Sequence, residues 1–212
     1  MNKKLRLLVT AKCHNKCPMC CNNQFDIEKI PIVDRLDYDE ISITGGEPLA
    51  AECGCKTFDL VDSIKNIQQA MGLPESKLYL YTSYFGGVSL KICSDIFDGI
   101  CLTPHKKADI DKFININAKM LKLKKRGNTN DNFNLSCSLR LNLFADMKAL
   151  LPKDIDLSLW KVKEMEWIKD CPVPEGEDFR RIAKLFYVMF KLFIIISLCV
   201  IISQLSEIKD KL

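Results

Sequence analysis

Apolar residues recur along the chain at the spacing of buried strands, and segments with helical periodicity lie between most of them. The strands are predicted at Leu5–Thr10, Glu40–Thr44, Lys77–Thr82, Gly99–Thr103, Leu135–Phe144 and Trp160–Ile168. The helices are predicted where apolar residues stand three or four apart, at Thr57–Met71, Leu90–Phe97 and Ala108–Lys122. Strands that alternate with helices are typical of an α/β fold with a parallel sheet.

The hydrophobic pattern changes toward the C-terminus. An amphipathic helical stripe starts at Phe179, and residues 192–202 then carry no charged side chain. These features divide the chain into a core, residues 1–178, and a C-terminal hydrophobic helix, residues 179–212. Residues 185–203 contain one lysine and reach the length of about 17–25 residues that a membrane span needs. The segment centred on residues 192–203 is therefore either a tail anchor in a membrane or a buried terminal helix.

Composition narrows the class of protein. The chain has 212 residues, of which 48% are hydrophobic, so it can bury the core of one domain. The formal net charge of +4 is mild and scattered, which argues against a nucleic-acid partner. The sequence contains eleven cysteines, and no secretory signal precedes the first strand. We therefore expect a cytoplasmic protein whose cysteines are thiols or metal ligands rather than disulfides.

Three cysteines stand close together immediately after the first predicted strand. Cys13, Cys17 and Cys20 are separated by three and then two residues, so their thiolates can meet at one metal centre. Soft thiolate ligands select zinc, Cu(I) or iron–sulfur clusters. A closed zinc site needs a fourth protein ligand, whereas a 4Fe–4S cluster held by three cysteines keeps one iron open for chemistry.

A second motif, Gly45-Gly46-Glu47-Pro48, follows the second predicted strand. A Cys-x3-Cys-x2-Cys loop after the first strand and a Gly-Gly-Glu-Pro segment after the second together resemble the radical S-adenosylmethionine enzymes. The resemblance implies a partial (β/α)6 barrel, here pared down, with its site at the carboxyl ends of the strands. It also implies that Cys13, Cys17 and Cys20 hold a 4Fe–4S cluster whose fourth iron binds S-adenosylmethionine. Gly45, Gly46, Glu47 and Pro48 would then border the methionine amino group, and Met19 would pack near the adenine.

Polar residues at the ends of the later strands are further candidates. By pattern alone, Ser83 and Arg140 are predicted to contact the cofactor, because a hydroxyl can bind a ribose and an arginine can clamp a carboxylate. The other polar residues at these strand ends are Thr82, Thr103, His105 and Asn142. The remaining cysteines of interest, Cys53, Cys55 and Cys171, are either ordinary thiols or ligands of an auxiliary cluster.

These features predict an enzyme in which cluster reduction cleaves S-adenosylmethionine to a 5′-deoxyadenosyl radical, which takes hydrogen from an unidentified substrate. Within the family, the chain is similar in size to the ribonucleotide-reductase activases and to the 7-carboxy-7-deazaguanine synthases. The substrate is accordingly either a protein or a small molecule. The expected electron donor is a flavodoxin or a ferredoxin. The alternative is a non-catalytic module in which the cysteine loop holds zinc or an electron-transfer cluster.

Overall fold

A sheet of parallel strands forms the centre of the structure, a computed structural model that describes residues 3–17, 20, 26–50, 53–85, 90–125, 137–168, 173 and 175–183. Seven strands are found in these ranges: β1 Lys4–Thr10, β2 Glu40–Gly45, β3 Lys77–Thr82, β4 Gly99–Leu102, β5 Ser138–Phe144, β6 Lys161–Met165 and β7 Glu177–Arg181. The helices are α1 Gly54–Ala70, α2 Leu90–Ile96, α3 Lys107–Lys125 and the single turn α4 Ala145–Lys148, with a short 3₁₀ turn, η2, at Ile27–Lys29.

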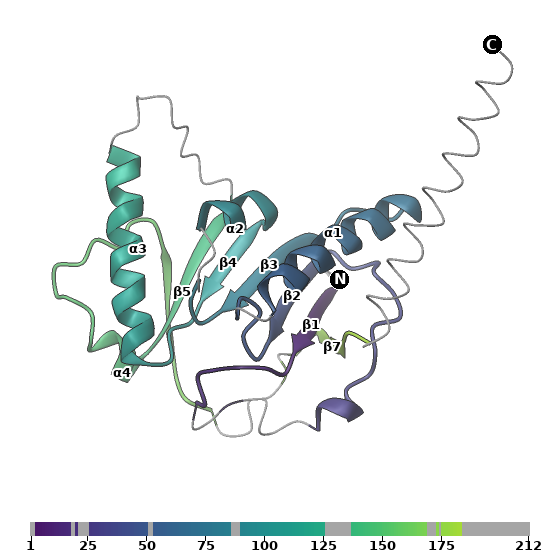
Figure 1. Ribbon diagram of the computed structural model, residues 1–212, viewed down its shortest axis with the longest axis horizontal. Helices are drawn as coiled ribbons and strands as arrows, with labels where there is room; N and C mark the ends of the chain where they lie inside the picture. The colour runs from purple at the N-terminus through teal and green to yellow at the C-terminus, as the bar shows by residue number, and fades with distance from the viewer. Residues whose placement is uncertain are drawn as a thin grey trace, which may run out of the picture. The chain divides into compact units, whose positions relative to one another are not determined.

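The strand order in the sheet is β6-β5-β4-β3-β2-β1-β7, and every neighbouring pair is parallel. Strands β1 to β6 therefore lie side by side in the order of the sequence. Because crossovers between parallel strands are right-handed, such an order puts the connecting helices on one face of the sheet. Figure 1 shows α1, α2 and α3 on that common side. The sheet is open, with β6 and β7 as its two edges.

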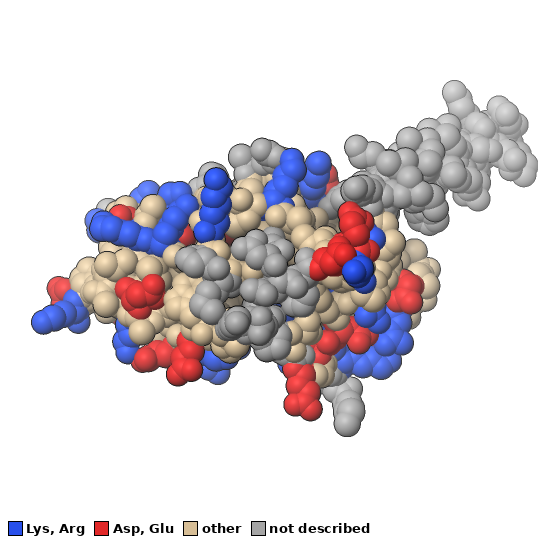
Figure 2. All heavy atoms as spheres, turned by 90° about the horizontal axis from the view of Figure 1, so that it is seen from below, with Lys and Arg blue, Asp and Glu red and all other residues tan. Residues whose placement is uncertain are grey.

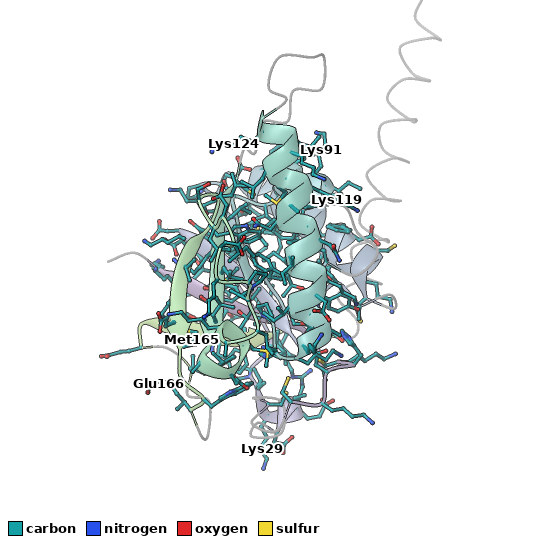
Figure 3. All side chains as sticks on the ribbon, turned by 90° about the vertical axis from the view of Figure 1, so that its left-hand side faces the viewer. Lys29, Lys91, Lys119, Lys124, Met165 and Glu166 are labelled. Carbon is teal, nitrogen blue, oxygen red and sulfur yellow. The ribbon has the colours of Figure 1, made fainter. Side chains whose placement is uncertain are left out.

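The two faces of the sheet differ sharply in polarity. The face toward the helices is apolar: Leu7, Ile43, Leu80 and Leu141 are at most 1% exposed. Burying a side chain of this size contributes about 1.5–3 kcal/mol, so this layer is the main core. Figure 3 shows side chains filling the space between α3 and the sheet. On the other face, many of the alternate residues are polar or aromatic and are partly or fully exposed, including Arg6, Ser42, Tyr79, Tyr81 and Arg140. Leu8 and Cys101 on this face are buried.

The carboxyl ends of the strands meet at one end of the molecule. In Figure 3, Met165 and Glu166 at the end of β6 lie toward the same end as Lys29, opposite to Lys119 and Lys124. The loops that follow β1, β2 and β3 leave the sheet at that end (Figure 1). Both sequence motifs are part of these loops, so the parallel topology brings them together at the carboxyl end of the sheet.

The predicted α/β fold with a parallel sheet is confirmed, and six of the strands lie where the hydrophobic pattern predicted them. The prediction of a helix starting at Phe179 is wrong, because Phe179 is part of β7 and pairs with Arg6 of β1. This strand was missed because it is short and mostly charged, and an ion pair between Arg6 and Glu177, with N and O 2.7 Å apart, helps to hold it. By its internal contacts, the chain divides into residues 1–181 and 182–212.

The predicted hydrophobic C-terminal helix has no support from the described residues, because residues 184–212 lie outside them. Among the helices of the described ranges, none is both long and apolar enough to cross a bilayer. The open sheet also leaves the partial barrel as a proposal rather than an observation.

Candidate functional site

The cysteine loop and the Gly-Gly-Glu-Pro segment lie directly against each other at the carboxyl ends of β1 and β2. The amide of Gly46 donates to the carbonyl oxygen of Thr10 at 2.7 Å, and the amide of Glu47 donates to that of Lys12 at 2.8 Å. The β1–β2 register shifts between Leu8 and Thr10, so that Thr10 lies opposite Gly45. Hydrogen bonding between the two strands thus continues past the sheet and fixes the start of the cysteine loop.

The contact between the segments is too close for any side chain at the two glycines. A Cβ atom on Gly45 would lie 2.4 Å from the carbonyl oxygen of Thr10, and one on Gly46 would lie 2.1 Å from that of Lys12. Both contacts are with backbone atoms, which cannot move aside as a flexible side chain can. The Gly-Gly pair is therefore required by the fit of one motif against the other.

Cys13, Cys17 and Cys20 are half-buried free thiols within one tight loop. The amide of Cys20 donates to the carbonyl oxygen of Cys17 at 3.2 Å, and the amide of Asn15 donates to the sulfur of Cys13 at 3.4 Å. Lys16 has a φ of +50°, a left-handed conformation that is uncommon outside glycine and is often found at functional loops. This residue turns the chain back between Cys13 and Cys17.

The surroundings of the thiols disfavour free thiolates. Burial raises the pKa of Cys13, and burial together with the neighbouring Cys20 and Cys13 thiols raises the pKa of Cys17 to about 11. A bound metal cation instead lowers the pKa of the thiols, because it stabilises thiolates directly. Within the described ranges, the loop does not bring three His, Cys, Asp or Glu side chains close enough to hold a single metal ion.

Glu47 is 1% exposed, and its carboxylate connects the ends of β2 and β3 through hydrogen bonds. Its Oε1 accepts from the Leu49 amide at 3.1 Å and from the Thr82 hydroxyl at 2.5 Å. Its Oε2 accepts from the amide and the hydroxyl of Ser83 at 2.8 and 2.6 Å. A carboxylate has about four acceptor positions, so the protein itself fills all of them. Thr82 and Ser83, which the pattern predicted at a strand end, are thus engaged with Glu47.

Asn15 continues these hydrogen bonds from Ser83 to helix α3. Its side-chain amide nitrogen donates to the Ser83 hydroxyl at 2.8 Å and to Oδ2 of Asp109 at 3.3 Å. Asp109 lies in the first turn of α3, is 1% exposed, and also accepts from the amide of His105 at 3.2 Å. A chain of hydrogen bonds through Ser83, Asn15 and Asp109 therefore connects Glu47 with the backbone amide of His105. Asp109 was not predicted from the sequence, because an acid in the first turn of a helix is common.

The other predicted site residues are only partly brought together. Arg140 is exposed on the uncovered face of β5, away from this chain of hydrogen bonds. The carbonyl oxygen of Pro48 accepts from the Thr57 hydroxyl at 2.8 Å, which joins the motif to α1. Cys53 is buried and Cys55 is exposed, so these two thiols lie in different environments. Two predicted positions, Met19 and Cys171, lie outside the described residues.

Charges of both signs surround this end of the molecule. Figure 2 shows the face seen from below in Figure 1, where Lys and Arg side chains are interspersed with Asp and Glu side chains. The mild net charge of +4 is therefore not concentrated in one continuous field on the drawn surface of this face.

The sequence was compared with protein-family models and with curated proteins, and neither comparison gave a match. Function has to be inferred from the chemistry of the two motifs and of the residues around them.

Proposed function

We propose that this chain is a radical S-adenosylmethionine enzyme in which Cys13, Cys17 and Cys20 hold a 4Fe–4S cluster. The observation that carries the proposal is the junction of the two motifs. The Gly46–Thr10 and Glu47–Lys12 hydrogen bonds join residues that are about 35 positions apart in the sequence. A close backbone fit that requires Gly-Gly beside a three-cysteine loop is difficult to explain by packing alone.

The residues present suit such a cluster. The three thiols are soft donors in one loop, and each cysteine of a cubane binds a different iron, so the sulfurs need not converge on a single ion. The burial that raises the pKa of Cys13 and Cys17 also limits the access of water to the ligands. When bound, the cluster supplies the electron that cleaves S-adenosylmethionine and so generates the hydrogen-abstracting 5′-deoxyadenosyl radical.

The chain's own residues position the cofactor in this proposal. Glu47 already accepts four hydrogen bonds, so its main part is to hold the ends of β2 and β3 in place. The segment from Gly45 to Pro48 then forms a fixed wall beside the cysteine loop for the methionine amino group. Arg140 offers an exposed guanidinium that can bind a carboxylate from the uncovered face of the sheet.

We also propose that the open sheet is a pared-down (β/α)6 partial barrel. The sequential order of β1 to β6 supports this, since it is the order found in barrels of parallel strands. In such a barrel, the polar sheet face with Arg6, Tyr81 and Arg140 would be the inner face toward the substrate. A flavodoxin or ferredoxin in the cytoplasm would supply electrons at the exposed side of the cysteine loop.

Anaerobic reconstitution with iron and sulfide tests the proposal. The full chain should take up about four irons and become brown, and Ala at Cys13, Cys17 or Cys20 should abolish the colour. Cys55→Ala is the matched control, because Cys55 is an exposed thiol outside the loop, and this variant should reconstitute fully. Reduced, reconstituted protein should convert S-adenosylmethionine to methionine and 5′-deoxyadenosine. Zinc as the sole metal, or cluster uptake that survives loss of Cys17, would refute the proposal.

A further inference from the structure

β6 is an edge strand: among the described residues, β5 pairs with it on one side and no strand pairs with it on the other. An edge strand presents a row of N–H and C=O groups that no neighbouring strand satisfies, so it can pair with a further strand. β6 covers Lys161–Met165, and its first four residues are exposed. This edge therefore offers both backbone groups and side chains to a second chain, and needs no cavity to do so.

Three cations lie together on the uncovered face of the sheet at this edge. Lys161 lies opposite Arg140 in the register of β5 and β6, and Lys163 lies two residues further along β6. Neighbouring strands are about 4.8 Å apart and alternate residues of one strand are about 6.6 Å apart, so the three positions are close neighbours. All three residues are exposed, and the ion pairs within the described ranges do not include them.

Such a group of cations is unfavourable without an anionic partner. Like charges at opposite positions of neighbouring strands repel each other, and β4, β5 and β6 place no acidic side chain on this face. Lysines on an edge strand can keep other chains away from it. That role does not explain Arg140, because β5 is an inner strand of the sheet. An anionic partner accounts for all three charges.

The other face of β6 carries an uncovered apolar residue. Val162 lies opposite Leu141, on the face toward the helices, and is 40% exposed. The next residue on that face, Glu164, forms an ion pair with Lys148. A chain beside β6 would therefore meet two lysines on one face and an exposed valine on the other. This pattern fits an extended segment in which acidic residues alternate with apolar residues.

We propose that the free edge of β6 binds an extended segment of a partner protein in which two acidic residues flank an apolar one. The segment adds a strand to the sheet, so that its carboxylates lie against Lys161 and Lys163 and its apolar side chain covers Val162. The acids stand two residues apart, as the lysines do. Arg140 adds to the positive potential from the neighbouring strand. The inference does not rest on the proposed cluster, because β6 is no part of the cysteine loop.

Fluorescence anisotropy with labelled peptides and the full chain tests the inference. A peptide of sequence Glu-Val-Glu-Val-Glu should bind saturably, and more weakly as the salt concentration rises, because exposed ion pairs are screened. The isomer Glu-Glu-Glu-Val-Val has the same charge without the alternation, and it should bind at least several-fold more weakly. The alternating peptide with every backbone nitrogen methylated has no N–H group to pair with a strand, and it should also bind at least several-fold more weakly.

A double charge reversal on β6 locates the site. Lys161→Glu together with Lys163→Glu should weaken the alternating peptide by about tenfold or more, because two attractive charge pairs become repulsive. Lys119→Glu together with Lys122→Glu is the matched control, since it makes the same change in net charge at two exposed positions of α3, and it should bind like the unaltered chain. Both double variants should melt within a few degrees of the unaltered chain, because the replaced side chains are exposed.

The alternative results each overturn the inference in a different way. No saturable binding of the alternating peptide would leave the lysines as protection of the edge, and equal binding by the β6 variant would place the site elsewhere. Equal binding of the methylated peptide would exclude strand addition. Tighter binding of a single-stranded RNA oligonucleotide, lost in the β6 variant, would indicate a nucleic-acid partner instead. Iron uptake is measured on the same samples, so failure of the cluster proposal and failure of this inference are seen separately.

Discussion

Gly46 offers the most direct test of the junction between the two motifs. In Gly46→Ala, the new Cβ would lie 2.1 Å from the carbonyl oxygen and 2.5 Å from the carbonyl carbon of Lys12, whereas ordinary contacts begin near 3.4 Å. The two segments would have to separate by about 1 Å, which is enough to break the Gly46–Thr10 and Glu47–Lys12 hydrogen bonds.

The cost can be worked from these contacts. Two lost hydrogen bonds contribute about 0.5–1.5 kcal/mol each, and overpacking adds about 1–3 kcal/mol, so the expected loss is about 2–6 kcal/mol. Gly72→Ala is the control, since Gly72 has a φ of +64° and no atom within 4 Å of an added Cβ. It should cost only the backbone strain of about 1–2 kcal/mol.

Equilibrium unfolding in urea measures both variants against the unaltered chain. The order of stability should be unaltered chain, then Gly72→Ala, then Gly46→Ala, and Gly46→Ala should also take up less iron on reconstitution. A Gly46→Ala protein as stable as Gly72→Ala would refute the close fit, and with it the main structural support for the proposed site.

Three other parts of the structure give further predictions. Glu47→Gln should lower the free energy of unfolding by about 1–3 kcal/mol in chemical unfolding, because an amide nitrogen would face the buried Ser83 donors. A change near zero would contradict the role of Glu47 in connecting β2 and β3. Because burial lowers the pKa of His105, the unfolded chain takes up this proton first, so stability should fall below about pH 6.5. Thermal unfolding at about pH 7.5 and about pH 5 should show a smaller fall in His105→Phe, and an equal fall would refute this assignment. A chain that ends at Ala183 should keep a cooperative melt by circular dichroism, whereas one that ends at Gly176 lacks β7 and should not; equal melts would show that β7 is dispensable.

The sequence predicted β1 to β5, in which apolar residues recur and are buried, because hydrophobic burial decides their place. It also predicted β6, although the residues of that strand are mostly exposed. It failed at β7, where charged residues such as Glu177 and Arg181 are held by pairing with β1 and by ion pairs. These interactions link residues far apart in the chain, and no local pattern reports them. For the same reason, the predicted boundary between the core and the C-terminal segment, at residues 178 and 179, falls inside β7.

The candidate site shows a similar division. The cysteine spacing and the Gly-Gly-Glu-Pro segment could be found in the sequence because each motif is local. The hydrogen bonds from Thr82 and Ser83 to Glu47 could not be found in the sequence, because they depend on how the ends of β2 and β3 are aligned in the sheet. Asp109 was missed for the same reason: its importance lies in Asn15 and His105, which reach it from two other loops.

The pairing of β7 with β1 has a consequence for how the protein is made. Arg6 and its partner Glu177 are 171 positions apart, so a ribosome adding about 5–20 residues per second needs roughly 10–30 s between them. During that interval, one side of β1 has no strand beside it, although the cysteine loop has already emerged. An open strand edge is a site for association with other chains. Slow translation or premature release of the nascent chain would therefore expose the edge of β1 to aggregation until β7 pairs with it.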